Sequence, residues 1–157
     1  MENIFNKIII VSLCDEFTVR VGKVLSQNLD MLFCDTKELV EYELINRDAL
    51  KKISSKEYLK NAETRVLKHI ASFENVVVAI NFDYLIHNFN ILKSESIVVF
   101  LNLTKKFVGE NGNKLNALSY EEKSQKLKEV CTISVNVKKT DENLVCNKII
   151  DEIGGIL

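Results

Sequence analysis

Runs of consecutive apolar residues alternate along the chain with stretches of mixed polarity. Runs such as IIIV, VVVAI and IVVFL are rich in isoleucine and valine and contain no polar position. This pattern is typical of strands that are buried on both faces of a sheet. The sequence therefore predicts five strands, at residues 7–13, 31–34, 75–80, 96–102 and 132–137.

Between the predicted strands, apolar residues recur at the spacing of one helix face. Shorter stripes predict helices after the first and third strands and before the fifth, and a last helix that ends at Gly154 and Gly155. The clearest stripe, which predicts a long amphipathic helix, consists of Tyr58, Leu59, Ala62, Val66, His69, Ile70 and Phe73. Strands that alternate with helices indicate a parallel sheet covered on both faces, here in a single α/β domain over residues 1–157.

Residues 104–123, TKKFVGENGNKLNALSYEEK, have the most loop-like composition in the chain. Gly109, Asn111, Gly112 and Asn113 are expected to interrupt any helix there. The stretch is interpreted either as a solvated loop or as a shortened lid over a binding site. Its composition favours the loop.

The charge balance excludes several classes of partner. The 157 residues include 21 basic and 22 acidic side chains, with a formal net charge of −1, which gives no general attraction to nucleic acid or to an anionic membrane. No apolar run approaches the roughly 18 residues of a membrane span. The first residues, MENIFNK, carry Glu2 where a signal peptide has basic residues, so we expect a cytoplasmic protein.

The cysteines and histidines do not indicate a metal or catalytic centre. The four cysteines form no C-x-x-C pair and the chain has only two histidines, so we expect reduced, mostly buried thiols rather than a zinc site or a disulfide. His69 is interpreted as a core or boundary residue, and the spacing around His87 implies no serine or cysteine partner. The cysteines are Cys14, Cys34, Cys131 and Cys146.

Several segments resemble the shikimate kinase family of P-loop kinases, and the resemblance extends over nearly the whole chain. KIIIVSLCDEFTVRVGKVLSQNLDMLFCDTKELVE resembles the family's first strand, phosphate loop, first helix and second strand. FCDTKELVE resembles its Asp-Thr-Asp segment, NAETRVL its Arg-x-x-Glu helix, and SIVVFLNLT the strand that leads to the lid. The resemblance implies a three-layer α/β/α domain with five parallel strands in the order 2-3-1-4-5. It also implies phosphoryl transfer from ATP, with Mg²⁺, to a hydroxyl of shikimate in aromatic amino acid biosynthesis.

The phosphate loop departs from the family pattern G-x-x-x-x-G-K-[S/T], in which backbone amides turn toward the phosphates. Phe17 replaces the second glycine, Thr18 replaces the lysine that bridges the β- and γ-phosphates, and Val19 replaces the hydroxyl that would hold Mg²⁺. The positions ahead of these are Ser12, Leu13, Cys14, Asp15 and Glu16. A nucleotide site is therefore not expected here.

Asp15 and Glu16 add electrostatic repulsion at the same junction. A carboxylate about 4 Å from a phosphate charge costs about 4 kcal/mol at an effective dielectric constant near 20. Asp15 is predicted to cap the following helix and Glu16 to lie in its first turn, where negative charge is favourable. Asp83, after the third strand, is predicted to cap the next helix in the same way. The protein's own carboxylates would thus take the place of the missing anion.

The positions that match the family's metal and base are changed in part. Asp35 matches an aspartate associated with Mg²⁺, whereas Lys37 replaces the aspartate that contacts the substrate hydroxyls and serves as the base. A lysine is protonated near neutrality and is a poor base. No catalytic residue is therefore assigned, and Asp35 is the one position that would ligate a metal.

Lysines stand where the family places the arginines that bind the substrate carboxylate. Lys60 and Lys123 replace these arginines without their bidentate fork. Glu63 is retained, and Asn81 ends the segment that replaces the family's run of glycines. Together with Lys37, the two lysines are interpreted either as a basic cleft for a small carboxylate or phosphate, or as solvated side chains.

Three hypotheses for the function follow. The first is a catalytically inactive kinase-like protein, without a nucleotide or metal cofactor, that binds a small anion or another protein. The second is a working shikimate kinase, or a kinase for a related hydroxy acid, that uses ATP and Mg²⁺. The third is a structural or regulatory subunit. The sequence favours the first, because the changes affect nucleotide, metal, base and substrate positions together and losses in phosphoryl transfer multiply.

Overall fold

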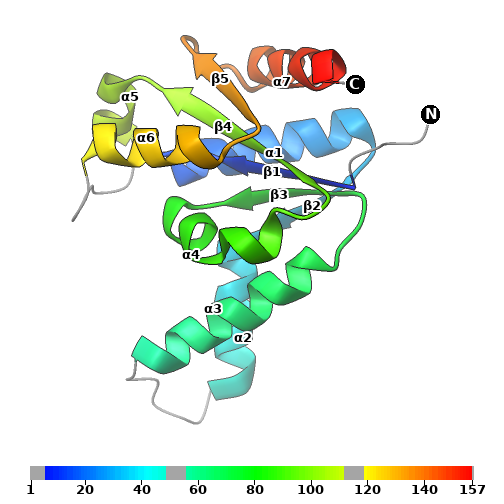
Figure 1. Cartoon of the computed structure of the whole chain (residues 1–157), viewed down its shortest axis with the longest axis vertical. Coiled ribbons are helices and arrows are strands. Elements are labelled where there is room, and N and C mark those ends of the chain that lie inside the picture. Colours follow the sequence, from blue (N-terminus) through cyan, green and yellow to red (C-terminus); the bar gives the residue numbers. More distant parts are fainter. Residues whose placement is uncertain (1–5, 49–55, 112–118, 157) are drawn as a thin grey trace.

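The computed structural model describes residues 6–48, 56–111 and 119–156. Its centre is a parallel five-stranded sheet in the order β2-β3-β1-β4-β5 (Figure 1). The predicted strands and their order are confirmed. The strands are β1 (Lys7–Val11), β2 (Leu32–Asp35), β3 (Val76–Ile80), β4 (Ser96–Leu103) and β5 (Ile133–Val137).

Burial along the strands follows their position in the sheet. Every residue of β1 and β3 is buried, as expected for strands covered by helices on both faces. The edge strand β5 alternates between buried and exposed positions instead. The uninterrupted apolar runs of the sequence therefore correspond to the centre of the sheet.

The helices form two layers around this sheet (Figure 1). α1 and α7 contact each other on one face, and α4 and α6 contact each other on the opposite face. α2 and α3 pack together beyond the β2–β3 side of the sheet, and α3 also contacts α4. The helices are α1 (Asp15–Leu29), α2 (Thr36–Asp48), α3 (Lys56–Ala71), α4 (Phe82–Leu92), α5 (Lys105–Asn111), α6 (Tyr120–Val130) and α7 (Glu142–Ile156).

The loop predicted at residues 104–123 is in part helical. Gly109 and Asn111 lie within α5, so the expectation that they interrupt a helix was wrong. The Thr104 hydroxyl accepts the backbone N–H of Phe107 at 3.2 Å, and Val108 is buried. This packing offsets the low helix propensity of glycine. Gly112 and Asn113 lie outside the described residues.

Two predicted helix ends were also wrong. α7 continues through Gly154 and Gly155 as far as Ile156. α4 is capped by Asn81 and not by Asp83, because the Asn81 side chain accepts the backbone N–H of Tyr84 at 2.8 Å. Asp83 lies in the first turn, where its charge is favourable but its side chain is past the capping position.

Among the residues that the structure describes, no helix combines the length and the apolar character needed to cross a bilayer.

Replacement of Asn81 by alanine tests the corrected cap. Asn81→Ala is expected to lower the free energy of unfolding by about 1 kcal/mol, because the amide at the start of α4 loses its acceptor. Asp83→Ala removes only a first-turn charge and is expected to cost about half as much or less at moderate salt. Urea denaturation of both variants measures the difference, and equal losses would contradict the assignment.

Candidate functional site

The carboxyl ends of β1, β2 and β3 meet where α1, α2 and α4 begin. In open parallel sheets, ligands bind at this edge. A cavity of about 410 Å³ lies there. Its lining consists of Asp15, Glu16, Thr18, Val19, Arg20, Asp35, Thr36, Lys37, Ala79, Ile80 and Asn81.

The β1–α1 junction (residues 12–18) is closed by its own polar groups. The hydroxyl oxygens of Ser12 and Thr18 lie 2.6 Å apart, and both side chains are buried. The carbonyl oxygen of Cys14 lies 2.9 Å from Ser12 Oγ and 3.2 Å from Thr18 Oγ1. One hydroxyl therefore donates to this carbonyl while the other donates across the pair.

Backbone amides of the junction are used in the same network. The N–H of Cys14 donates to Ser12 Oγ at 3.1 Å, and the N–H of Thr18 donates to the carbonyl oxygen of Cys14 at 3.1 Å. α1 begins at Asp15, with Cys14 at the capping position in an extended conformation. The prediction that Asp15 caps α1 was therefore wrong, whereas Glu16 lies in the first turn as predicted.

Helix α5, which lies in the segment interpreted as a loop or a lid, packs against this junction. Phe17 is fully buried, and its ring makes an edge-to-face contact with Phe107 at 6.0 Å between centroids. The Cys14 thiol donates to the carbonyl oxygen of Asn111 at 3.3 Å. Phe17 thus fills the core between α1 and α5, and the junction is covered from that side.

The side chain of Arg20 forms an ion pair with α7. Its Nε lies 2.8 Å from the carboxylate of Glu142, and its guanidinium lies 5.7 Å from the centre of the Phe17 ring. The guanidinium of Arg20 therefore does not take the place of the phosphate-loop lysine, which is Thr18 in this chain.

The side chains of Asp35 and Asn81 each accept a backbone N–H in the first turn of the helix that follows. Asp35 Oδ1 accepts the backbone N–H of Lys37 at 3.2 Å in the first turn of α2. The next residue, Thr36, donates from its buried hydroxyl to the carbonyl oxygen of Ala79 at 2.9 Å. Lys37 itself is exposed at the cavity rim.

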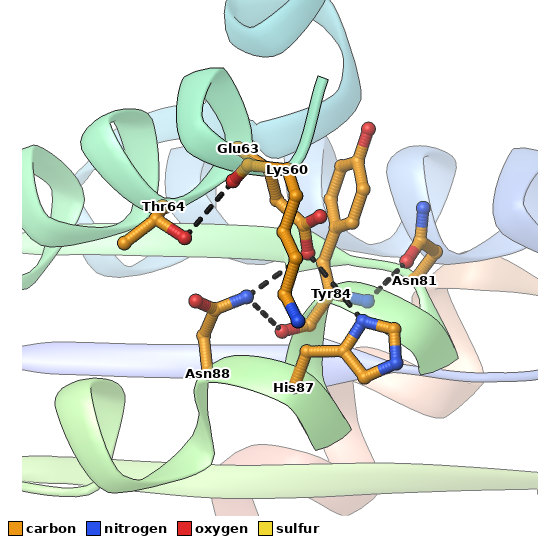
Figure 2. Close-up of polar contacts among 7 residues, drawn as sticks. All are labelled: Lys60, Glu63, Thr64, Asn81, Tyr84, His87 and Asn88. Atoms are coloured by element: carbon orange, nitrogen blue, oxygen red, sulfur yellow. Dashed lines mark hydrogen bonds and ion pairs between the residues drawn. The ribbon is translucent and has the colours of Figure 1, made fainter. Parts of the chain in front are cut away.

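Lys60 and Glu63 line a second cavity, of about 380 Å³, between α2, α3 and α4. Figure 2 shows the polar side chains of α3 and α4 facing one another at this place. Glu63 Oε1 accepts a hydrogen bond from Asn88 Nδ2 at 3.0 Å and lies 3.8 Å from His87 Nδ1. The full lining is Val40, Leu44, Leu59, Lys60, Glu63, Tyr84 and His87.

Asn88 links this cluster to a kink in α4. Its backbone leaves the helical region, with φ −121° and ψ 16°. The buried side-chain amide donates both to Glu63 and to the carbonyl oxygen of Tyr84, the latter at 2.9 Å. The sequence analysis missed Asn88, because its role depends on the contact between α3 and α4.

Tyr84 also lines the second cavity. Burial, and after it the carboxylates of Glu63 and Glu41, raises the pKa of Tyr84 above its usual value. The phenol therefore keeps its proton at neutral pH and acts as a hydrogen-bond donor. Tyr84 was assigned only to an apolar stripe in the sequence analysis.

The three lysines of the predicted basic cleft have different surroundings. Lys37 belongs to the first cavity and Lys60 to the second. Lys123 contributes to neither, and its ammonium lies 5.2 Å from the centre of the Phe82 ring.

Comparison with solved structures identifies the fold. Shikimate kinase from Aquifex aeolicus matches with a TM-score of 0.75 and 19% identity, covering 95% of this chain and 96% of that one. The chain has the fold of the shikimate kinases. Shikimate kinase from Acinetobacter baumannii, in complex with shikimate, matches with a TM-score of 0.67 and 19% identity, covering 96% and 94% of the two chains.

A related kinase shares this shikimate kinase fold. A gluconokinase from Sinorhizobium meliloti matches with a TM-score of 0.64 and 14% identity, covering 99% of this chain and 95% of that chain. No protein-family model matches the sequence, and no curated protein sequence matches it.

The β1–α1 junction does not fit the Mg·ATP that P-loop kinases use. Bound phosphates need inward-facing amides, a lysine and a hydroxyl for Mg²⁺. Here the amide of Cys14 is bonded to Ser12, Thr18 stands in place of the lysine, and Val19 offers no ligand atom to a metal. Among the described residues, no group of three or more histidine, cysteine or acidic side chains is placed to hold a metal ion.

The cysteines are free thiols, as predicted, and three of them are buried. Burial, and after it the charges of Asp35 and Glu38, raises the pKa of Cys34 to about 12. Burial, and after it Glu142, raises the pKa of Cys146 to about 11. Neither thiol is activated as a nucleophile, because the thiolate is the reactive form.

Removal of the Ser12 hydroxyl tests the closed junction. Ser12→Ala leaves the buried N–H of Cys14 without its acceptor, so it is expected to lower the free energy of unfolding by about 1–3 kcal/mol. Ser134, which is exposed on β5, provides the control, and Ser134→Ala is expected to change stability by less than about 0.5 kcal/mol. Similar urea midpoints for the two variants would contradict the network.

Thiol labelling tests the burial of the cysteines. At pH 8, iodoacetamide is expected to modify the half-buried Cys131 in native protein, whereas Cys34 and Cys146 react only after urea is added. Peptide mapping by mass spectrometry measures each rate. Rapid labelling of Cys34 in native protein would contradict its raised pKa and its burial.

Proposed function

We propose that this chain is a kinase-fold protein that does not transfer phosphate from ATP and that acts by binding a small molecule. The closed β1–α1 junction carries this proposal: the hydroxyls of Ser12 and Thr18 and the backbone of Cys14 satisfy one another in a buried network. A nucleotide phosphate would have to break these bonds before it reached the amide of Cys14.

The residues around the junction support the same proposal. Thr18 and Val19 supply neither the cation nor the metal-binding hydroxyl of a phosphate loop. Asp15 and Glu16 place carboxylates in the first turn of α1, where a phosphate would otherwise bind. Phosphoryl transfer depends almost entirely on positioning and charge stabilisation, so these changes combine to remove it.

A binding role is supported by the two cavities at the carboxyl side of the sheet. Each is within the size range of small-molecule sites, and each contains one exposed lysine, Lys37 or Lys60. The first cavity also carries the carboxylates of Asp15, Glu16 and Asp35, whereas Glu63 of the second is bonded to Asn88. A small anion therefore matches the charge of Lys60 in the second cavity.

Thermal unfolding with Mg·ATP tests the absence of a nucleotide site. A ligand at 100 times its Kd raises the free energy of unfolding by about 2.7 kcal/mol, which moves Tm by several degrees. We expect no shift with millimolar Mg·ATP, and no ADP release when shikimate or gluconate is added. An active shikimate kinase in the same assay is the positive control. A clear shift with ADP release would overturn the proposal.

A variant of Glu16 tests whether charge repulsion or the hydrogen-bond network of Ser12 and Thr18 prevents ATP from binding. Glu16 is exposed, so Glu16→Gln should fold normally while it removes one negative charge from the cavity. We expect this variant to ignore Mg·ATP as well, because the network of Ser12 and Thr18 is unchanged. Nucleotide binding by Glu16→Gln would mean that charge alone, and not the network, keeps ATP out.

A further inference from the structure

The first cavity, at the carboxyl edge of the sheet, has a carboxylate on each of two opposite sides. The strand order β2-β3-β1 places the end of β3 between the starts of α1 and α2. Glu16 lines the cavity from α1 and Asp35 lines it from the end of β2. Since neighbouring strands lie about 4.8 Å apart, the ends of β1 and β2 are separated by about 10 Å. The two carboxylates therefore belong to different walls.

The carboxylate oxygens of Glu16 and Asp35 are accessible to a ligand. Glu16 is exposed, and within residues 6–48, 56–111 and 119–156 its side chain makes no hydrogen bond or ion pair. Asp35 uses Oδ1 for the backbone N–H of Lys37, which leaves Oδ2 without a partner in the same ranges. An ionised carboxylate only accepts hydrogen bonds, so both walls offer acceptors with a negative charge.

The cations that line this cavity do not balance these carboxylates. Arg20 forms its ion pair with Glu142 of α7, at 2.8 Å. Lys37 is exposed, and its ammonium forms no ion pair with any residue that the structure describes. Water screens the charge of such a lysine. Glu16 and Asp35 together thus outweigh Lys37, and the cavity has an excess of negative charge.

The size and the apolar part of the lining define the body of the ligand. The volume of about 410 Å³ is that of a small-molecule site. In the described ranges no three acidic, histidine or cysteine side chains converge on one point to hold a metal ion. Val19, Ala79 and Ile80 line the space with hydrocarbon, which stabilises methylene groups and disfavours polar ones. Two separated charges joined by a hydrocarbon chain match this arrangement.

We propose that the first cavity binds a small dication with two ammonium groups joined by a short hydrocarbon chain, for which 1,4-diaminobutane is the probe. One ammonium donates to Glu16 and the other to Oδ2 of Asp35. The methylene groups lie against Val19, Ala79 and Ile80. The inference rests on the proposed function, since it assigns a ligand to a cavity that no nucleotide occupies. It is separate from the anion proposed for the second cavity.

Probes of different charge define the ligand class by isothermal titration calorimetry at low ionic strength. 1,4-Diaminobutane is expected to bind. 1-Aminobutane, which has one charge, is expected to bind at least about tenfold more weakly. Uncharged 1,4-butanediol and the dianion succinate are expected to give no signal from this cavity. Equal binding of the monoamine and the diamine would overturn the inference, as would displacement of the diamine by an equal concentration of Mg²⁺.

Two pairs of variants locate the site. Glu16→Gln and Asp35→Asn are each expected to weaken diamine binding by about tenfold or more, and the asparagine keeps a side-chain oxygen for the N–H of Lys37. The matched controls Glu152→Gln and Asp151→Asn, at exposed positions of α7, are expected to leave binding unchanged. Circular dichroism checks that all four variants fold. Equal weakening within either pair would overturn the assignment.

A variant of Lys37 tests the sign of the ligand's charge. Lys37→Gln removes a like charge from the rim of the cavity, so it is expected to strengthen diamine binding severalfold. Lys68→Gln, at an exposed position of α3, is expected to have no effect. Weaker diamine binding by Lys37→Gln would overturn the inference, because a ligand that depends on this lysine is an anion.

The outcomes separate this inference from the proposed function. If none of the probes binds and Mg·ATP gives no shift of Tm, the ligand class is wrong and the absence of phosphoryl transfer stands. If Mg·ATP shifts Tm and ADP is released, both fail, because the cavity then serves a phosphoryl transfer. If the diamine binds and Mg·ATP shifts Tm without ADP release, the dication site stands and the closed junction is wrong.

Discussion

Three helix N-termini point at one edge of the sheet, and their unpaired amides must find partners there. The chain satisfies some of them with its own groups. Asp35 accepts an amide of α2, and Asn81 accepts an amide of α4. At α1, Ser12 accepts the N–H of the capping residue Cys14, and the side chain of Cys14 makes no capping bond. In a kinase of this fold, the phosphates of a nucleotide take up part of that demand. Here the amides at the starts of α2 and α4 have side-chain acceptors from the protein itself.

Contacts between side chains hold the β1–α1 junction at the carboxyl side of the sheet. The buried hydroxyl pair of Ser12 and Thr18 holds the β1–α1 junction, and Phe17 and Cys14 fasten α5 over it. A lid that opens and closes over a nucleotide would have to break these contacts.

The cavity between α2, α3 and α4 is built differently from the junction. Its polar groups are held by contacts between helices, such as Glu63 with Asn88 and His87, and Lys60 remains unpaired within the described ranges. The same fold therefore carries a hydrogen-bonded β1–α1 junction and, beside it, a cavity between helices. The proposed binding role rests on this difference.

The sequence by itself determined the five strands, their parallel arrangement and the loss of the phosphate-loop residues, because apolar pattern and residue identity are local properties of the chain. It failed at helix ends, where Asp15 and Asp83 have the chemistry of caps but Cys14 and Asn81 hold the capping positions. Only the tertiary structure decided that Thr18 bonds back to Ser12, that α5 covers the junction, and that Lys60 and Lys37 line different cavities. These features depend on the packing of segments far apart in the chain, and no local pattern records which side chains that packing brings together.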